Sequence, residues 1–144
     1  MIEKILNRLK DKKILIAGFG REGQSSLSFL KEYLPDAYIG VADKNEAALS
    51  EIDVKYHCHF GESYLSCLSD YDIVLKTPGI SLKDIDLPNV EISSQTDLFL
   101  EAFHDKIIGV TGTKGKSTTS SLIYHLLKFD KIQILFVLLL TNQN

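Results

Sequence analysis

The segment Thr111–Thr118, which reads T-G-T-K-G-K-S-T, contains the residue types that bind the phosphates of a nucleoside triphosphate. Gly112 and Gly115 let the backbone curl so that its N–H groups point toward phosphate oxygens. Lys116 supplies a positive charge to the outer phosphates, and the hydroxyl of Ser117 can ligate Mg²⁺. The segment therefore predicts a site for the phosphates of a nucleoside triphosphate together with a magnesium ion.

The spacing of this loop departs from the general pattern G-x-x-x-x-G-K-[ST], because Val110 stands where the first glycine is usual. The competing interpretation is a turn rich in Gly, Thr and Ser that caps an ordinary helix. A buried-strand pattern at Lys106–Val110 and a helical pattern at Lys116–Lys128 favour the phosphate site, since such loops lie between a strand and a helix. Lys114 is either a solvated loop lysine or an additional phosphate contact.

A second glycine-rich segment, Gly18–Gly23, reads G-F-G-R-E-G and follows the strand pattern Lys13–Ala17. In this context G-x-G-x-x-G is the dinucleotide-fold fingerprint: its glycines allow a tight turn, close approach of a pyrophosphate, and close packing of helix on strand. Asp43 ends the next strand pattern, where an acid can accept hydrogen bonds from a ribose or a base. The fingerprint does not separate NAD from a nucleotide-sugar, and a turn without a ligand is the alternative.

Two shorter segments are candidates for further sites. Lys76–Ser81 (K-T-P-G-I-S) follows the strand pattern Asp72–Leu75, at the carboxyl end where open α/β sheets bind ligands, although it also fits a plain turn. His57-Cys58-His59 resembles a metal motif, but alternation along a strand places Cys58 opposite the two histidines. We therefore expect no metal site there.

Apolar runs alternate with helical patterns over the first 93 residues, which predicts a Rossmann-like parallel sheet covered by helices on both faces. The chain opens with a short amphipathic helix. The predicted strands are Lys13–Ala17, Tyr38–Ala42, Val54–Phe60, Asp72–Leu75 and Val90–Ile92, and the predicted helices between them are Ser25–Tyr33, Glu46–Ile52 and Ser63–Ser69.

A second α/β unit begins near residue 94 and adds few elements. It comprises a helix at Ser94–His104, the strand, phosphate loop and helix already described, and a strand-like run at Asp130–Leu140. We expect two domains, residues 1–93 and 94–144, of which the second is too short to close its own core.

Composition excludes several classes of protein. The chain has 144 residues, a net charge of −3 and scattered basic residues, which argues against a nucleic-acid binder. Cys58 and Cys67 form neither a disulfide framework nor a zinc signature, so a reducing, cytoplasmic location is expected. No run reaches the roughly 18 apolar residues that span a membrane, so we expect no membrane partner.

Three motifs, in order and spacing, resemble the Mur ligases of peptidoglycan synthesis. G-F-G-R-E-G-Q-S at Gly18–Ser25 is similar to the family's N-terminal glycine loop, and K-T-P-G-I at Lys76–Ile80 to its S-P-G-I turn. V-T-G-T-K-G-K-S-T at Val110–Thr118 is similar to its V-T-G-T-N-G-K-S-T ATP loop, and the K-S-T ending separates it from folylpolyglutamate synthetases, which read G-K-G-S. The resemblance covers about residues 1–128.

The resemblance implies an ATP- and Mg²⁺-dependent amide ligase that adds D-glutamate to UDP-N-acetylmuramoyl-L-alanine through an acyl phosphate. The implied UDP-sugar-binding residues are Gly18, Phe19, Gly20, Arg21, Glu22, Gly23, Asp43, Lys44, Thr77, Pro78 and Gly79. The implied ATP-binding residues are Gly112, Thr113, Lys114, Gly115, Lys116, Ser117 and Thr118, with Lys116 as the catalytic residue and Ser117 as the metal ligand.

The chain also departs from the family. Lys114 replaces the commoner Asn, and after Lys128 the sequence F-D-K-I-Q-I-L-F-V-L-L-L-T-N-Q-N ends where the family continues. We therefore expect a fragment, with a UDP-sugar-binding domain at 1–93 and an incomplete start of the ATP-binding domain at 94–144.

The fragment is expected to be inactive alone and to self-associate through the apolar run Ile132–Leu140, whose sheet partner we expect to be missing; the full-length enzyme is expected to be a monomer. An NAD-binding oxidoreductase or regulatory domain, and a catalytically dead interaction module, are the alternatives.

Overall fold

The computed structural model describes residues 2–50, 52–83, 85, 87, 89–129 and 136–140, with only the backbone described for 129 and 136–140. It divides into two compact units, Met1–Ala102 and Phe103–Asn144, and each is described here by itself.

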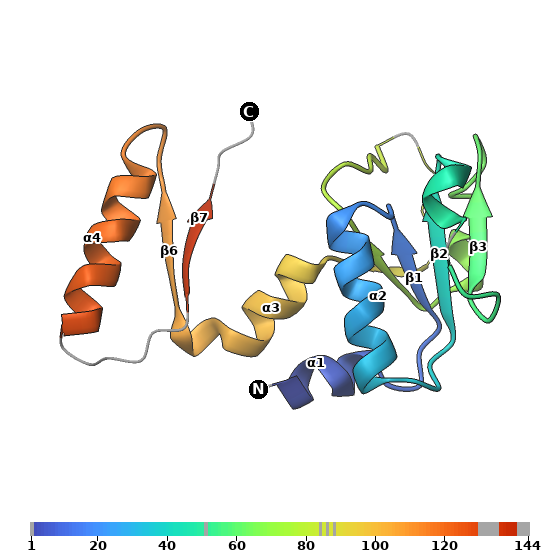
Figure 1. The fold of residues 1–144 in the computed structure, drawn as a ribbon, viewed down its shortest axis with the longest axis horizontal. Coiled ribbons are helices and arrows are strands. Elements are labelled where there is room, and N and C mark those ends of the chain that lie inside the picture. Colours follow the sequence, from blue (N-terminus) through green and yellow to red (C-terminus); the bar gives the residue numbers. More distant parts are fainter. Residues whose placement is uncertain are drawn as a thin grey trace. The chain divides into compact units, whose positions relative to one another are not determined.

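The first unit is built on five parallel strands in the order β3-β2-β1-β4-β5 (Figure 1). The strands are β1 (Ile14–Ala17), β2 (Ile39–Asp43), β3 (His57–Phe60), β4 (Ile73–Lys76) and β5 (Glu91–Ser93). β1 pairs with β2 on one side and β4 on the other, which satisfies its backbone groups and allows all four of its residues to be apolar and buried. The predicted α/β fold with a parallel sheet is confirmed in this unit.

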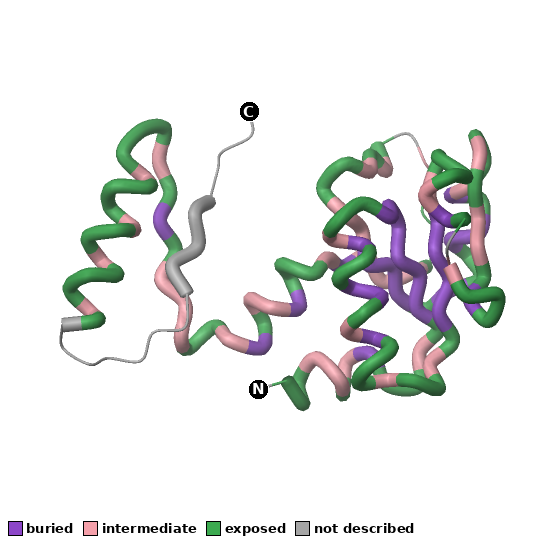
Figure 2. The backbone as a smooth tube through the Cα atoms, viewed as in Figure 1, coloured by how far each residue is buried: buried purple, intermediate pink, exposed green. Residues whose placement is uncertain are grey.

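The two faces of the sheet are covered differently. The helices α1 (Ile2–Leu9), α2 (Arg21–Tyr33) and α3 (Gln95–Phe103) contribute Leu9, Leu27, Leu30 and Leu98 to a core with Ile14 and Ile16. On the other face Leu15, Ala17 and Val74 pack against Leu65, Leu68 and Tyr71, which lie in turns and a short 3₁₀ helix. Figure 2 shows the buried strands inside these layers.

Several predicted elements are shorter than their patterns indicated. The helix expected at Ser63–Ser69 is wrong, since only the 3₁₀ turn η2 (Leu68–Asp70) forms; serine side chains compete for backbone groups and disfavour a short helix. The helix expected at Glu46–Ile52 is the 3₁₀ turn η1 (Glu46–Leu49). The strand expected from Val54 starts only at His57.

The late start of β3 has a local cause. The carboxylate of Asp53 accepts a hydrogen bond from the N–H of Lys55, and its carbonyl accepts one from the N–H of Tyr56. These bonds close a turn that holds residues 53–56 out of the ladder. Within β3, Cys58 packs against the first core while His59 bonds Tyr71 of the second, so the predicted alternation holds.

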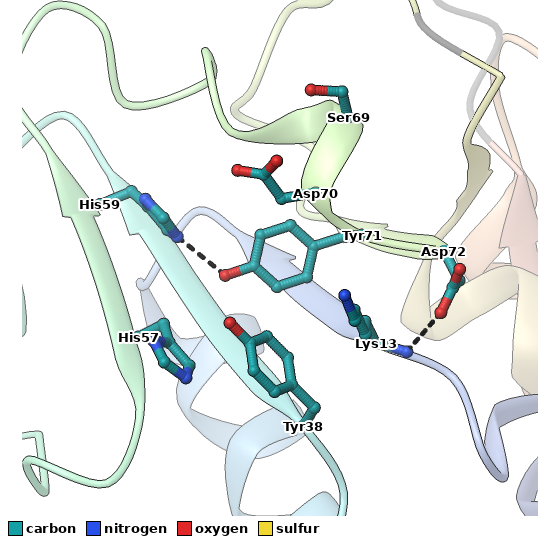
Figure 3. Close-up of a pocket in the computed structure, with 8 residues that line it drawn as sticks. All are labelled: Lys13, Tyr38, His57, His59, Ser69, Asp70, Tyr71 and Asp72. Carbon is teal, nitrogen blue, oxygen red and sulfur yellow. Dashed lines mark hydrogen bonds between the residues drawn. The ribbon is translucent and has the colours of Figure 1, made fainter.

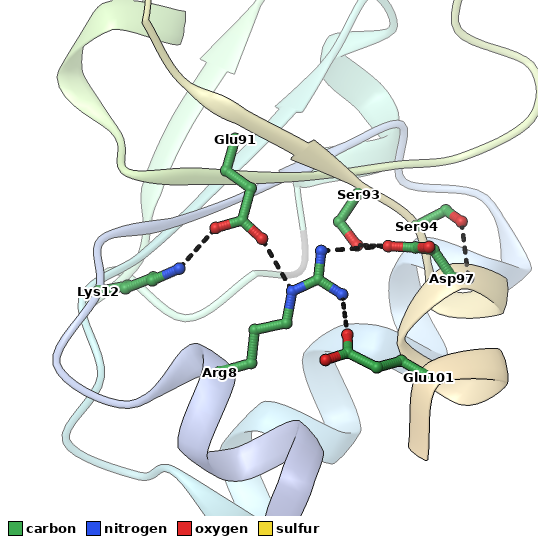
Figure 4. Close-up of polar contacts among 7 residues, drawn as sticks. All are labelled: Arg8, Lys12, Glu91, Ser93, Ser94, Asp97 and Glu101. Carbon is green, nitrogen blue, oxygen red and sulfur yellow. Dashed lines mark hydrogen bonds and ion pairs between the residues drawn. The ribbon is translucent and has the colours of Figure 1, made fainter. Parts of the chain in front are cut away.

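Arg8 ties α1 to the sheet edge and to α3 (Figure 4). Its Nε donates to Glu91 at 2.8 Å, while its terminal nitrogens pair with Asp97 at 3.2 Å and with Glu101. Lys12 also pairs with Glu91, at 2.5 Å. Hydrogen bonds from Lys12 and Arg8 lower the pKa of the Glu91 carboxyl. These contacts, with buried Leu98, hold α3 on the first unit.

The second unit consists of η3 (His104–Lys106), β6 (Ile107–Thr111), α4 (Lys116–Phe129) and β7 (Phe136–Leu140). β6 and β7 pair in parallel, so the expectation that the tail lacks a sheet partner is wrong for Phe136–Leu140, while 132–135 lie outside the described residues. The apolar side chains of α4 are unequally covered: Leu122 and Leu126 are 60% and 68% exposed, whereas Ile123 and Leu127 are half-buried. Within the described residues, β6 and β7 form a sheet of only two strands, which covers one narrow face of α4.

Among the described residues, no helix is long and apolar enough to cross a bilayer. Within the same ranges, no three His, Cys, Asp or Glu side chains gather where they could hold a metal ion.

We predict that Glu91→Gln lowers the free energy of unfolding by about 1 kcal/mol at pH 7, because Arg8 and Lys12 lose a charged acceptor. The folded-state pKa of Glu91 is lowered, so this stabilisation is complete above its ordinary value of 4.5 and is lost as the pH falls through the lowered value. Urea unfolding at neutral and at decreasing acidic pH measures both effects. Glu3→Gln, exposed on α1, is the control, and equal losses in both variants would contradict the prediction.

Candidate functional site

The loops that follow β1, β2 and β4 meet at the carboxyl ends of the strands, which form one rim of the sheet. This rim is called the carboxyl edge. The N–H of Gly18 donates to the carbonyl of Ala42 at 2.7 Å, and the N–H of Thr77 donates to the carbonyl of Ala17 at 2.9 Å. The strand order also reverses between β1 and β4, and in open α/β sheets ligands bind at the carboxyl ends of strands beside such a switch point. The glycine loop and the T-P-G turn therefore flank the position where a ligand is expected.

Gly18 is the most constrained residue of this edge. Its φ is +92°, and a Cβ added there would lie 2.1 Å from Thr77 Oγ1 and 3.1 Å from Ile80 Cγ1. Gly23 is constrained in another way, because its added Cβ would lie 2.1 Å from the carbonyl oxygen of Gly18. Gly18 thus permits the tight turn, and Gly23 lets α2 pack closely against it.

The N-terminus of α2 opens directly beside this turn. Its N-cap, Gly20, is extended and provides no side-chain cap, and a Cβ added there would meet no heavy atom within 4 Å. The first N–H groups of a helix have no partners within it and carry a partial positive charge. Arg21 is exposed in the first turn and Glu22 is half-buried. This terminus can accept an anionic group, and Arg21 adds a full charge nearby.

Asp43 connects the glycine loop to the end of β2. One carboxylate oxygen accepts the N–H of Phe19 at 2.7 Å, and the other accepts the N–H of Asn45 at 2.8 Å. Sequence reasoning assigned Asp43 to the ligand and missed this loop-holding role, because Phe19 lies 24 residues away. Lys44 is exposed and pairs with Glu62 at 3.0 Å.

The T-P-G turn presents mostly exposed groups. Thr77 is half-buried against Gly18, whereas Pro78 and Gly79 are exposed. The N–H of Ile80 donates to the carbonyl of Thr77 at 3.2 Å and closes the turn. The structure therefore brings Gly18–Gly23, Asp43 and Thr77–Gly79 to one edge.

The phosphate loop lies in the second unit, between β6 and α4. Gly112 and Gly115 have φ values of +147° and +78°, which glycine adopts without strain. Lys116 curls back over the loop, and its Nζ donates to the carbonyl of Gly112 at 2.5 Å. The remaining members of the predicted set, Thr113, Lys114, Ser117 and Thr118, are exposed. The loop therefore lies between a strand and a helix, as a phosphate loop does, while the Lys116 ammonium is engaged with the backbone of the loop.

A cavity of about 470 Å³ lies at the other end of the strands of the first unit, where their amino ends are (Figure 3). Two polar contacts join residues that line it: His59 Nε2 lies 2.8 Å from the Tyr71 hydroxyl, and the backbone N–H of Lys13 donates to the Asp72 carboxylate at 2.7 Å. Burial lowers the pKa of His59 and raises that of Tyr71, which keeps both neutral at pH 7. None of the predicted site residues lines this cavity.

A parallel sheet with a glycine loop and a helix terminus at its switch point is the arrangement of a Rossmann-like domain. Residues 12–96 match the family described as Mur ligase MurD-like, N-terminal domain. This match covers more than half of the chain, so the chain belongs to the Mur ligase family, in its MurD-like group.

Its relatives carry the name UDP-N-acetylmuramoylalanine–D-glutamate ligase. The protein of Acetivibrio thermocellus is 34% identical over 137 residues, which cover 84% of this chain and 28% of the relative. That of Clostridium acetobutylicum is 34% identical over 139 residues, covering 83% and 28%. That of Haemophilus influenzae is 25% identical over 134 residues, covering 90% and 31%. The chain therefore spans less than a third of the length of these relatives.

We predict that Gly18→Ala lowers the free energy of unfolding by about 2–3 kcal/mol, because the new methyl group meets Thr77 and the positive φ is strained. Gly20→Ala is the matched control in the same loop. Its methyl group enters open space at a negative φ, so a loss below about 1 kcal/mol is expected. Urea unfolding compares the two variants, and similar losses would contradict the prediction.

Proposed function

We propose that this chain is the N-terminal part of an ATP-dependent amide ligase that joins D-glutamate to UDP-N-acetylmuramoyl-L-alanine. Its own contribution is to bind the UDP portion of that substrate. The observation that carries the proposal is the convergence of the glycine loop, Asp43 and the T-P-G turn at the switch point of a MurD-like domain.

The geometry suggests how the substrate would be held. The diphosphate would lie at the N-terminus of α2, where free N–H groups and the Arg21 guanidinium favour negative charge. Asp43 and Lys44 would lie by the uracil, since each carboxylate oxygen of Asp43 keeps acceptor capacity beyond its backbone bond. Thr77–Gly79 would line the cleft for the sugar, and Glu22 would lie beside the diphosphate.

The second unit would bind ATP. Bound Mg²⁺ would neutralise phosphate charge, with the Ser117 hydroxyl among its ligands. Lys116 would turn from the Gly112 carbonyl to the phosphates and stabilise the transferring group. In the proposed reaction the substrate carboxylate attacks the γ-phosphorus and ADP leaves. The amine of D-glutamate then attacks the acyl carbon, phosphate leaves, and the nitrogen loses a proton.

We predict that the chain binds UDP and UDP-N-acetylmuramoyl-L-alanine in calorimetry, and does not bind NADH. Arg21→Met should weaken UDP binding about tenfold, by removing a charge-assisted contact, and change uridine binding little. Lys10→Met removes an exposed charge from the segment before β1 and serves as the control. A folded sample that binds NADH but not UDP would reject this function in favour of a dinucleotide-binding domain.

We predict no ligase turnover by these 144 residues alone, because they match only 28–31% of the length of the related ligases. The measurement is ADP release on addition of D-glutamate, UDP-N-acetylmuramoyl-L-alanine and ATP. The full-length Acetivibrio thermocellus ligase, assayed under the same conditions, shows that the assay works. D-glutamate-dependent ADP release by the chain itself would contradict the prediction.

A further inference from the structure

Lys76 is the last residue of β4, at the carboxyl ends of the strands where the nucleotide-sugar site is proposed. It is not among the residues predicted to bind the UDP-sugar. It is in register with Ala17, which is in register with Ala42, so its neighbours on this face are small. The methyl side chains leave room for the lysine stem, and Lys76 is half-buried. Its ammonium folds back onto the following turn instead of extending into water.

The ammonium holds two carbonyl groups of that turn. Lys76 Nζ donates to the carbonyl oxygen of Ile80 at 2.7 Å and to that of Thr77 at 3.1 Å. Thr77 and Ile80 are also the two residues whose side chains close over Gly18. One side chain therefore fixes both contacts that the turn makes with the glycine loop.

The Thr77 N–H also ties the start of the turn to the Ala17 carbonyl, and Ile80 packs against the second core, but the middle of the turn has fewer contacts. Pro78 has no N–H to donate, and Gly79 is exposed with open space around its Cα. Apart from Lys76, the bond from the Ile80 N–H to the Thr77 carbonyl closes it. An ammonium that donates to two carbonyls forms stronger bonds than a neutral donor, and an apolar replacement leaves those oxygens without it.

We propose that Lys76 is a positioning residue of the nucleotide-sugar site, which acts by clamping the turn 77–80 onto the glycine loop. This inference rests on the proposed function. It assigns to Lys76 a role through the protein backbone, distinct from a direct contact with the phosphates of the ligand.

The test compares Lys76→Met with Lys76→Arg and with Lys83→Met in the full chain. Lys83 is an exposed lysine just beyond the turn. We expect Lys76→Met to weaken UDP binding about tenfold, and Lys76→Arg, which keeps a charged multiple donor, to retain most of it. Lys83→Met should bind as the unmodified chain does.

Hydrogen exchange without ligand separates positioning from direct contact. If Lys76 clamps the turn, the amides of Ile80 and Gly18 exchange faster in Lys76→Met, while that of Ile16 in β1 is unchanged. Weaker UDP binding with unchanged exchange would overturn the proposal in favour of a direct phosphate contact, and unchanged binding would overturn it outright. Lys76→Gln, which keeps a neutral donor, replaces the methionine variant if that one does not fold.

The two proposals fail separately. If the unmodified chain does not bind UDP, the proposed function is rejected, and the exchange comparison still measures whether Lys76 holds the turn. If the unmodified chain binds UDP and Lys76→Met binds equally well, only the role of Lys76 is rejected.

Discussion

The arrangement of the loops at the carboxyl ends of the strands depends on one backbone constraint, the turn with positive φ at Gly18. β1 is the central strand of the sheet and is buried along its whole length, so the chain must leave it at the edge and reverse at once into α2. A Cβ added to Gly23 would collide with the Gly18 carbonyl oxygen, and a Cβ added to Gly18 would collide with Thr77 Oγ1. A side chain at position 18 would push apart the helix terminus and the T-P-G turn that the proposed ligand needs together.

Polar side chains then fix the loops around this turn. Asp43 holds the Phe19 N–H, Lys76 holds the carbonyls of Thr77 and Ile80, and the backbone bonds of Gly18 and Thr77 join neighbouring strands. The Asp43 bond and the two backbone bonds join separate loops or strand ends, whereas the Lys76 bonds fix the turn that directly follows β4. The edge is therefore preorganised, and less ordering of loops has to accompany binding of a ligand.

Sequence reasoning located the three glycine- or proline-containing segments because each follows a strand directly, and strand and loop are adjacent in the chain. It also predicted the parallel sheet from the alternation of elements. It overestimated the helix at Ser63–Ser69, where only a 3₁₀ turn forms, because the intrinsic helix propensity of a segment so short and rich in serine is low. It missed the bond of Asp43 to Phe19 and the clamp of Lys76, because these depend on three-dimensional placement and on the conformation of a turn.

Lys116 and Lys76 both donate hydrogen bonds from their ammonium groups to backbone carbonyls, but the consequences for ligand binding differ. Lys116 donates to the single carbonyl of Gly112, four residues before it, within a loop that contains two glycines of positive φ. A single bond of this kind can be exchanged for bonds to phosphate oxygens, which is compatible with the phosphate contact proposed for Lys116. Lys76 donates to two carbonyls of the same turn. Moving its ammonium to a ligand would release both carbonyls and loosen the contacts over Gly18, so its geometry favours retention of the clamp when a nucleotide binds.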